Sequence, residues 1–125
     1  MVEGRYNYEG RVFASVANAA NGDVGDDTVF HYHQEGDLVW ADYAGGKVRK
    51  GHLLGTVGAD GALSFTYHHV RDDGEQMTGV CRSSLTVLED GRYRLDEDWR
   101  WTSGDGSRGR STIDETRQQN SSAQR

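Results

Sequence analysis

The 125-residue chain contains no proline and a single cysteine, Cys81. One cysteine cannot form a disulfide within the chain, which fits a reducing compartment, so we expect a cytoplasmic protein. No apolar run approaches the roughly 20 residues of a membrane-spanning helix. The N-terminal segment also lacks the basic start and the apolar core of a signal peptide. Together these absences argue against a disulfide scaffold and against a membrane-bound protein.

Positive charge is also scarce. The chain has 14 Lys and Arg against 20 Asp and Glu, which gives a formal net charge of −6. Nucleic-acid-binding proteins need a basic face, so the charge argues against a nucleic-acid partner and against anionic membrane surfaces. The sequence has no phosphate-binding loop, dinucleotide fingerprint or zinc-protease motif. We therefore expect no cofactor, and neither phosphoryl transfer nor nucleotide-dependent redox chemistry.

Glycine, by contrast, is abundant, with 17 residues, and it recurs in short turn signals. These signals are NGD (21–23), EGD (35–37), AGG (44–46), ADG (59–61), DDG (72–74), EDG (89–91) and SGDG (103–106). The segments between them are rich in Val, Thr, Tyr, Phe and Trp, which is typical of an all-β sandwich or barrel. The predicted strands are 6–17, 27–34, 37–43, 47–57, 62–71, 76–88, 92–102 and 107–115.

Short connections between all eight strands predict an up-and-down meander, which can close into an antiparallel barrel without exposed edges. Eight strands leave an interior for side chains and at most one small ligand. The longest connection, ANAANGDVGDD (17–27), could carry a helical turn or act as a lid. We predict one barrel domain over residues 1–116, followed by a disordered polar tail over 117–125.

Two stretches carry a family resemblance. GADGALSFTY (58–67) resembles an avidin hairpin, and DEDWRWTSGDGSRGRSTID (96–114) resembles the late avidin hairpin, where a Trp-bearing strand is followed by a TSG turn. The order of elements is similar to the calycin architecture of avidins and lipocalins, including small bacterial calycin-like barrels. The resemblance implies a barrel with a cavity, and a homodimer paired through outer faces that include Phe13 or Val80. It does not imply biotin binding, because the avidin ligand contacts cannot be matched here residue by residue.

The segment RYRLDEDWRW (92–101) alternates charged and apolar residues, except that Glu97 falls on the apolar side. Its inward face is predicted to be Tyr93, Leu95, Glu97, Trp99 and Trp101. A three-residue EDG turn, with glycine in the left-handed position, pairs Ser83 with Glu97 and Cys81 with Trp99.

Other strands are assigned by the same alternation. The segment 62–71 points Tyr67 and His69 inward, and a three-residue ADG turn places Gly51 beside His69. For 37–43 we favour the face with Trp40 inward and Asp42 near one mouth. For 27–34 the inward face is not decided: it carries either Phe30 and Tyr32 or His31 and His33.

A carboxylate on an apolar face is costly to bury without partners, and desolvation raises its pKa into the range of a general acid or base. Glu97 therefore has two possible roles. It either binds a ligand or is a structural part of the core, where Ser83, a tyrosine or a tryptophan N–H would hydrogen-bond to it. Cys81 has no nucleophile signature around it, so we predict that it is a small buried apolar residue.

The sequence thus predicts binding of a small apolar or aromatic ligand inside the barrel. The candidate ligand-binding residues are Trp40, Tyr67, Trp99, Trp101, Ser83 and Tyr32. The alternative is a cofactor-independent cyclase, isomerase or dehydratase in the same cavity, with Glu97, His69 and Asp42 as candidate catalytic residues. A lower alternative is a cupin-like metal site of His31, His33 and His69, although the acidic ligand and the proline of the cupin motifs are missing, so we expect no metal.

Overall fold

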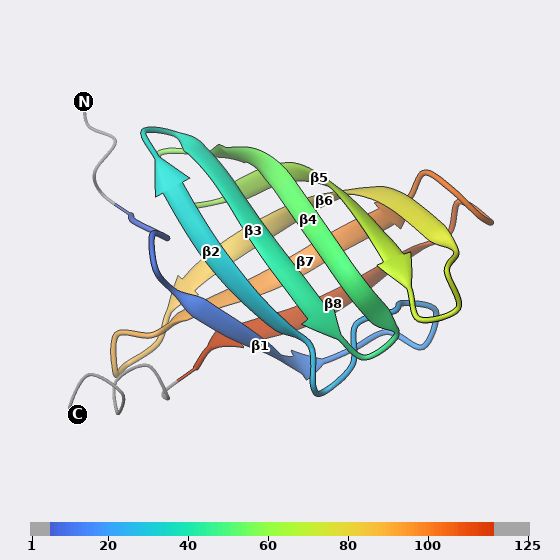
Figure 1. Ribbon diagram of the computed structural model, residues 1–125. Coiled ribbons are helices and arrows are strands. Elements are labelled where there is room, and N and C mark those ends of the chain that lie inside the picture. The colour runs from blue at the N-terminus through green and yellow to red at the C-terminus, as the bar shows by residue number, and fades with distance from the viewer. Residues whose placement is uncertain (1–5, 117–125) are drawn as a thin grey trace.

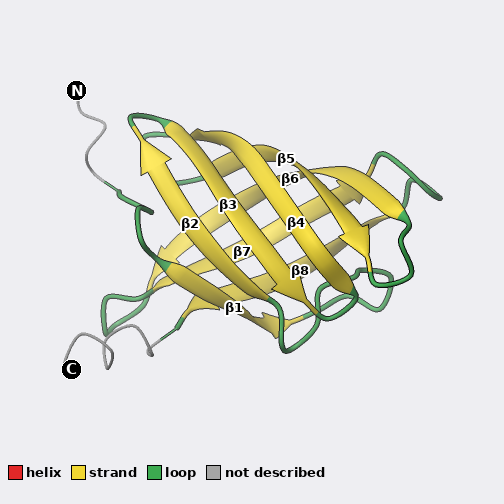
Figure 2. Ribbon diagram, in the orientation of Figure 1, coloured by secondary structure: helices red, strands yellow, loops and turns green. Residues whose placement is uncertain are grey.

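Eight antiparallel strands form a closed barrel (Figure 1). The computed structural model describes residues 6–116, and all regular elements within that range are strands (Figure 2). They are β1 (Val12–Ala17), β2 (Val29–Glu35), β3 (Leu38–Gly45), β4 (Val48–Val57), β5 (Leu63–Arg71), β6 (Gln76–Val87), β7 (Tyr93–Trp101) and β8 (Arg108–Glu115). Each strand pairs with its neighbour in sequence, and β1 pairs with β8. The predicted all-β, up-and-down barrel is confirmed.

The strand limits agree with the sequence to within two residues, except at the first strand. Residues 6–11 form a turn instead, in which the Arg11 backbone N–H donates to the Tyr8 carbonyl at 3.1 Å. The turn carries the Tyr8 side chain into the barrel, where its hydroxyl donates to the Gly61 carbonyl at 2.5 Å. The predicted disordered tail, 117–125, lies outside the described residues. Among the described residues, no helix is long and apolar enough to cross a membrane.

Both predicted three-residue hairpins are present. Gly61 and Gly91 have φ values of +85° and +90°, a region that glycine enters without strain. The resulting registers place Ser83 opposite Glu97 and Gly51 opposite His69, as the sequence predicted. These two turns therefore decide which side chains meet across β4–β5 and β6–β7.

One end of the barrel is filled by an aromatic plug, which we define as Tyr8, Phe13, Tyr32 and Tyr93. Tyr8, Phe13 and Tyr32 are fully buried, and the rings of Phe13 and Tyr32 meet edge to face with centroids 5.0 Å apart. Phe13 therefore cannot belong to an outer pairing surface, contrary to expectation. These packed rings fill this end of the barrel and keep Tyr32 inside the core.

The prediction that Trp40 and Asp42 face inward is wrong. In β3 the buried side chains are Val39, Ala41 and Tyr43, while Asp42 is exposed and Trp40 stacks on His33 outside the barrel. The strand has apolar residues on both faces, so alternation could not separate them. The EGD turn has two loop residues, which pairs Glu35 with Leu38 and thereby turns Phe30 and Tyr32 inward.

Candidate functional site

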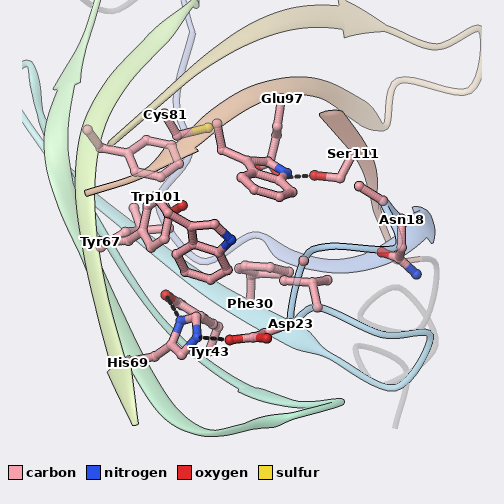
Figure 3. A pocket seen from close by; sticks show the side chains of 16 residues that line it. Asn18, Asp23, Phe30, Tyr43, Tyr67, His69, Cys81, Glu97, Trp101 and Ser111 are labelled. Atoms are coloured by element: carbon pink, nitrogen blue, oxygen red, sulfur yellow. Dashed lines mark hydrogen bonds and ion pairs between the residues drawn. The ribbon is translucent and has the colours of Figure 1, made fainter. Parts of the chain in front are cut away.

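The end of the barrel opposite the plug is hollow. A cavity of about 50 Å³ lies there, bordered by strands β2 to β8 and by the β1–β2 connection (Figure 3). Space of that size holds roughly four water-sized groups. The connection that the sequence suggested as a lid thus supplies part of the cavity wall, through residues such as Asn18, Ala19 and Asp23.

Six of the 16 lining residues are Phe, Tyr or Trp. The Trp99 and Trp101 rings have centroids 5.5 Å apart and planes inclined by 61°, and Tyr67 meets Trp101 at 5.8 Å and 64°. Strand alternation predicted that all three side chains face inward, and they line the cavity. Because neighbouring rings are strongly inclined, they form adjacent walls around the space rather than one flat stack.

Glycines on neighbouring strands make room for these rings. Gly109 lies opposite Trp99 and Gly79 opposite Tyr67 in the strand registers. A Cβ atom at Gly109 would lie 2.5 Å from the Trp99 ring, and one at Gly79 would collide with the Tyr67 ring. The rings therefore lie against the barrel wall, and the centre of this end stays open.

Glu97 is one of two buried carboxyl groups that line the cavity, and Asp23 is the other. The Glu97 side chain lines the space and is 8% exposed, and it accepts one hydrogen bond, from Ser111 Oγ to Oε1 at 3.0 Å. Burial raises its pKa to about 7, although the Ser111 hydrogen bond acts in the opposite direction. No described residue donates a hydrogen bond to its second oxygen, Oε2. Ser83, the predicted partner, is opposite in register but contacts the Cys81 thiol instead.

A second polar group lies on the other side of the cavity from Glu97 (Figure 3). His69 Nε2 lies 2.8 Å from Asp23 Oδ2, and His69 Nδ1 lies 2.9 Å from the Tyr43 hydroxyl. Arg71 Nε also donates to Asp23 Oδ2, at 2.8 Å. A carboxylate only accepts, so His69 donates from Nε2 and its Nδ1 accepts from Tyr43.

The charge state of this group follows from its surroundings. Burial alone would raise the pKa of Asp23, but the hydrogen bonds from Arg71 and His69 outweigh it and hold the pKa below its usual range. Burial lowers the pKa of His69, despite the carboxylate beside it. Asp23 is therefore ionised and paired with Arg71, while His69 is neutral at pH 7.

The Asp23 contacts also hold the β1–β2 connection over the barrel end. The Lys47 backbone N–H donates to the Asp23 carbonyl at 3.0 Å, and Trp101 Nε1 donates to the Asn21 carbonyl at 3.1 Å. The connection is thus attached to β3–β4 and to β7 by hydrogen bonds. It forms an ordered rim around the cavity.

The remaining predicted residues lie elsewhere. Asp42 and its partner His52 are on the outer face, 2.9 Å apart, and Tyr32 and Ser83 are buried outside the cavity lining. Burial raises the pKa of the Cys81 thiol, so it stays protonated and unreactive at neutral pH.

The three histidines of the metal alternative are not brought together. His31 and His33 are on the outer face of β2, whereas His69 points into the barrel. Within residues 6–116, no group of three or more His, Cys, Asp or Glu side chains is placed to hold a metal ion.

Sequence reasoning missed several lining residues, namely Asn18, Asp23, Phe30, Tyr43 and Ser111. Ser111 had a usable signal, because a tight turn between β7 and β8 would have placed it opposite Glu97. Asp23 had none, since it lies in an irregular connection 46 residues from His69.

Comparison with known proteins agrees with the fold. The search of curated proteins and the search of solved structures each gave no match. The family model described as avidin-like protein matches residues 6–116, which is nearly the whole chain. An avidin-like barrel suggests small-molecule binding in general. The chain therefore belongs to the avidin-like protein family.

Proposed function

We propose that the protein binds a small molecule in the cavity between Glu97 and His69. The observation that carries the proposal is the free Oε2 atom of Glu97, in a side chain that is 8% exposed and lines an aromatic cavity. In residues 6–116 the fully buried side-chain polar atoms without a partner are the Tyr32 hydroxyl and Thr116 Oγ1, so Glu97 Oε2 is accessible from the cavity. A ligand there can donate a hydrogen bond to it.

The chemistry of the walls supports this proposal. Small-molecule sites are concave and mostly apolar, with a few polar groups that orient the ligand. Here Trp99, Trp101 and Tyr67 supply apolar surface, and Glu97 and His69 supply polar groups on opposite sides. The cavity of about 50 Å³ takes a small ligand, or the end of a longer one that extends past the β1–β2 connection.

A variant pair on that connection tests the proposal. Ala19 lines the cavity and is partly buried, whereas Ala20 is exposed and does not line it. Ala19→Trp should fill the cavity mouth, and Ala20→Trp adds the same side chain outside it. A library of soluble small fragments is screened against all three proteins by ligand-observed NMR.

The proposal expects fragments that bind the wild type and Ala20→Trp, compete with one another, and lose binding in Ala19→Trp. Fragments that bind Ala19→Trp unchanged would place binding outside the cavity. A screen without any competing set of fragments would also contradict the proposal.

Proton-transfer catalysis is the second candidate function. A pKa of about 7 suits a general acid or base at neutral pH, and Glu97 has that pKa inside the cavity. A cyclase, isomerase or dehydratase would use it to exchange a proton with the bound substrate. The test is NMR of cavity-binding fragments in D2O. Exchange of C–H protons that stops in Glu97→Gln supports catalysis, and the absence of exchange in the wild type supports binding alone.

A further inference from the structure

The cavity is lined by acidic residues but by no basic ones. Of the 16 described residues that line it, Glu97 and Asp23 carry carboxyl groups, and none is Lys or Arg (Figure 3). Arg71 neutralises Asp23 through a 2.8 Å ion pair, so Glu97 is the carboxyl group without a counter-charge. An anionic ligand would meet a buried acid and no cation, which is unfavourable.

We infer that the ligand is a small organic ammonium ion, or the ammonium end of a longer molecule, held by the Glu97 carboxylate and by the aromatic walls. The inference rests on the small-molecule binding proposed above and names the class of ligand. An ammonium group with a proton to donate would satisfy Glu97 Oε2, which receives no hydrogen bond from the described residues. The same positive charge would provide the counter-charge that the cavity lacks.

The walls suit a cation as well as an apolar group. Ring faces of Trp and Tyr attract cations electrostatically, most strongly when the site is desolvated. Trp99, Trp101 and Tyr67 present three mutually inclined rings on the cavity. Alkyl groups on the nitrogen would contact these rings while the charge stays close to the carboxylate.

The size of the cavity limits the ammonium ion. Space of about 50 Å³ corresponds to roughly four water-sized groups, which is close to a protonated nitrogen with up to three small substituents. A large polycation would have to lie mostly outside. The inference therefore concerns a compact ammonium head.

With a pKa of about 7, Glu97 should change its charge between pH 6 and pH 8. The other ionisable groups that surround it from neighbouring strands and the β1–β2 connection are Tyr32, Tyr43, Tyr67, Cys81, His69 and Asp23. Burial raises the pKa values of the tyrosines and the thiol, so these stay neutral, and it lowers that of His69, which favours the neutral imidazole. Asp23 stays ionised beside Arg71, and Asp96 faces solvent on the outer side of β7.

Three probes of similar shape test the inference: tert-butylammonium, tert-butanol and trimethylacetate. Their affinities are measured by NMR titration at pH 6 and pH 8. We expect tert-butylammonium to bind at least tenfold more tightly than tert-butanol at pH 8, and trimethylacetate not to bind in the cavity. Because only ionised Glu97 pairs with the cation, the affinity for tert-butylammonium should rise about tenfold from pH 6 to pH 8.

Variants locate the effect at Glu97. Glu97→Gln should abolish the preference for the cation and the pH dependence. Asp98→Asn removes one negative charge from the outer face of the same strand, where Asp98 is exposed, and should keep both. If Glu97→Gln fails to fold, the change in tert-butylammonium affinity between pH 6 and pH 8 in the wild type still tests the inference.

The outcomes separate the two proposals. If tert-butanol or trimethylacetate binds in the cavity as tightly as tert-butylammonium, the ammonium inference is overturned and small-molecule binding stands. The same holds if the affinity for tert-butylammonium does not change between pH 6 and 8. If none of the probes binds and the fragment screen is also negative, both proposals fail.

Discussion

Replacing Glu97 with Gln should change how the stability of the barrel depends on pH. The carboxyl group has a usual pKa of 4.5, and burial raises it to about 7 in the folded protein. Between these values the folded protein keeps a proton that the unfolded chain has released, so the free energy of unfolding falls as the pH rises. At about 1.4 kcal/mol per pH unit, the fall from pH 4.5 to pH 7 is about 3 kcal/mol. Gln has nearly the same shape and does not titrate, so the variant lacks this fall.

Urea unfolding of the wild type, Glu97→Gln and Asp98→Asn, followed by tryptophan fluorescence, measures the effect. At pH 4.5, Glu97 is protonated in the folded barrel, and Glu97→Gln should match the wild type within about 1 kcal/mol. At pH 8 the wild type carries a buried carboxylate, and Glu97→Gln should be the more stable protein by about 3 kcal/mol.

Asp98→Asn should follow the pH profile of the wild type, because the Asp98 side chain is exposed on the outer face. The reasoning is refuted if the stability difference between the wild type and Glu97→Gln is the same at both pH values. That result would mean that folding leaves the pKa of the Glu97 carboxyl group unchanged, so the group is well solvated, and the argument for a desolvated carboxyl group in the cavity would fail.

Three further substitutions test the core, the plug and the rim of the cavity. Leu95 is fully buried, so Leu95→Ala should cost about 2–5 kcal/mol in urea unfolding, whereas Leu54→Ala at a half-exposed position should cost less than about 1. The Tyr32 hydroxyl is buried and has no hydrogen-bond partner among the described residues. Tyr32→Phe should therefore leave the free energy of unfolding unchanged or raise it by about 1 kcal/mol. A decrease of more than about 1 kcal/mol would show that the hydroxyl has a partner. Asp23→Asn removes the carboxylate that His69 and Arg71 share, and should destabilise the protein by about 3 kcal/mol and increase amide hydrogen exchange in residues 18–27. Unchanged exchange there would show that Asp23 does not hold the connection.

The expected homodimer stays a prediction. Val80 lies on the outer face of the barrel and is partly buried, while Phe13 belongs to the plug. Sedimentation velocity of the wild type measures the oligomeric state, and a substitution of Val80 by Glu should shift a dimer toward monomer. A monomer at all concentrations contradicts the prediction.

Strand β7 was predictable because its outward face is almost entirely charged. That contrast settled the orientation of Glu97, Trp99 and Trp101, and the local turn chemistry at Gly91 then determined the register with β6. Strand β3 lacks the contrast, with Trp40 on one face and Tyr43 on the other, so its orientation depended on the turn that joins it to β2. The pattern of hydropathy carries information only where the two faces differ.

The amino-acid sequence by itself determined the class of the protein, the positions of most strands and the inward carboxyl group, because alternation and turn chemistry act over a few residues. It could not determine which end of the barrel is filled by the plug, because the plug brings Tyr8 and Tyr32 together with Tyr93 of β7. Nor could it place Asp23, whose contact with His69 joins an irregular connection to a strand 46 residues away. Those features depend on closure of the sheet, which alone brings distant segments within hydrogen-bonding distance.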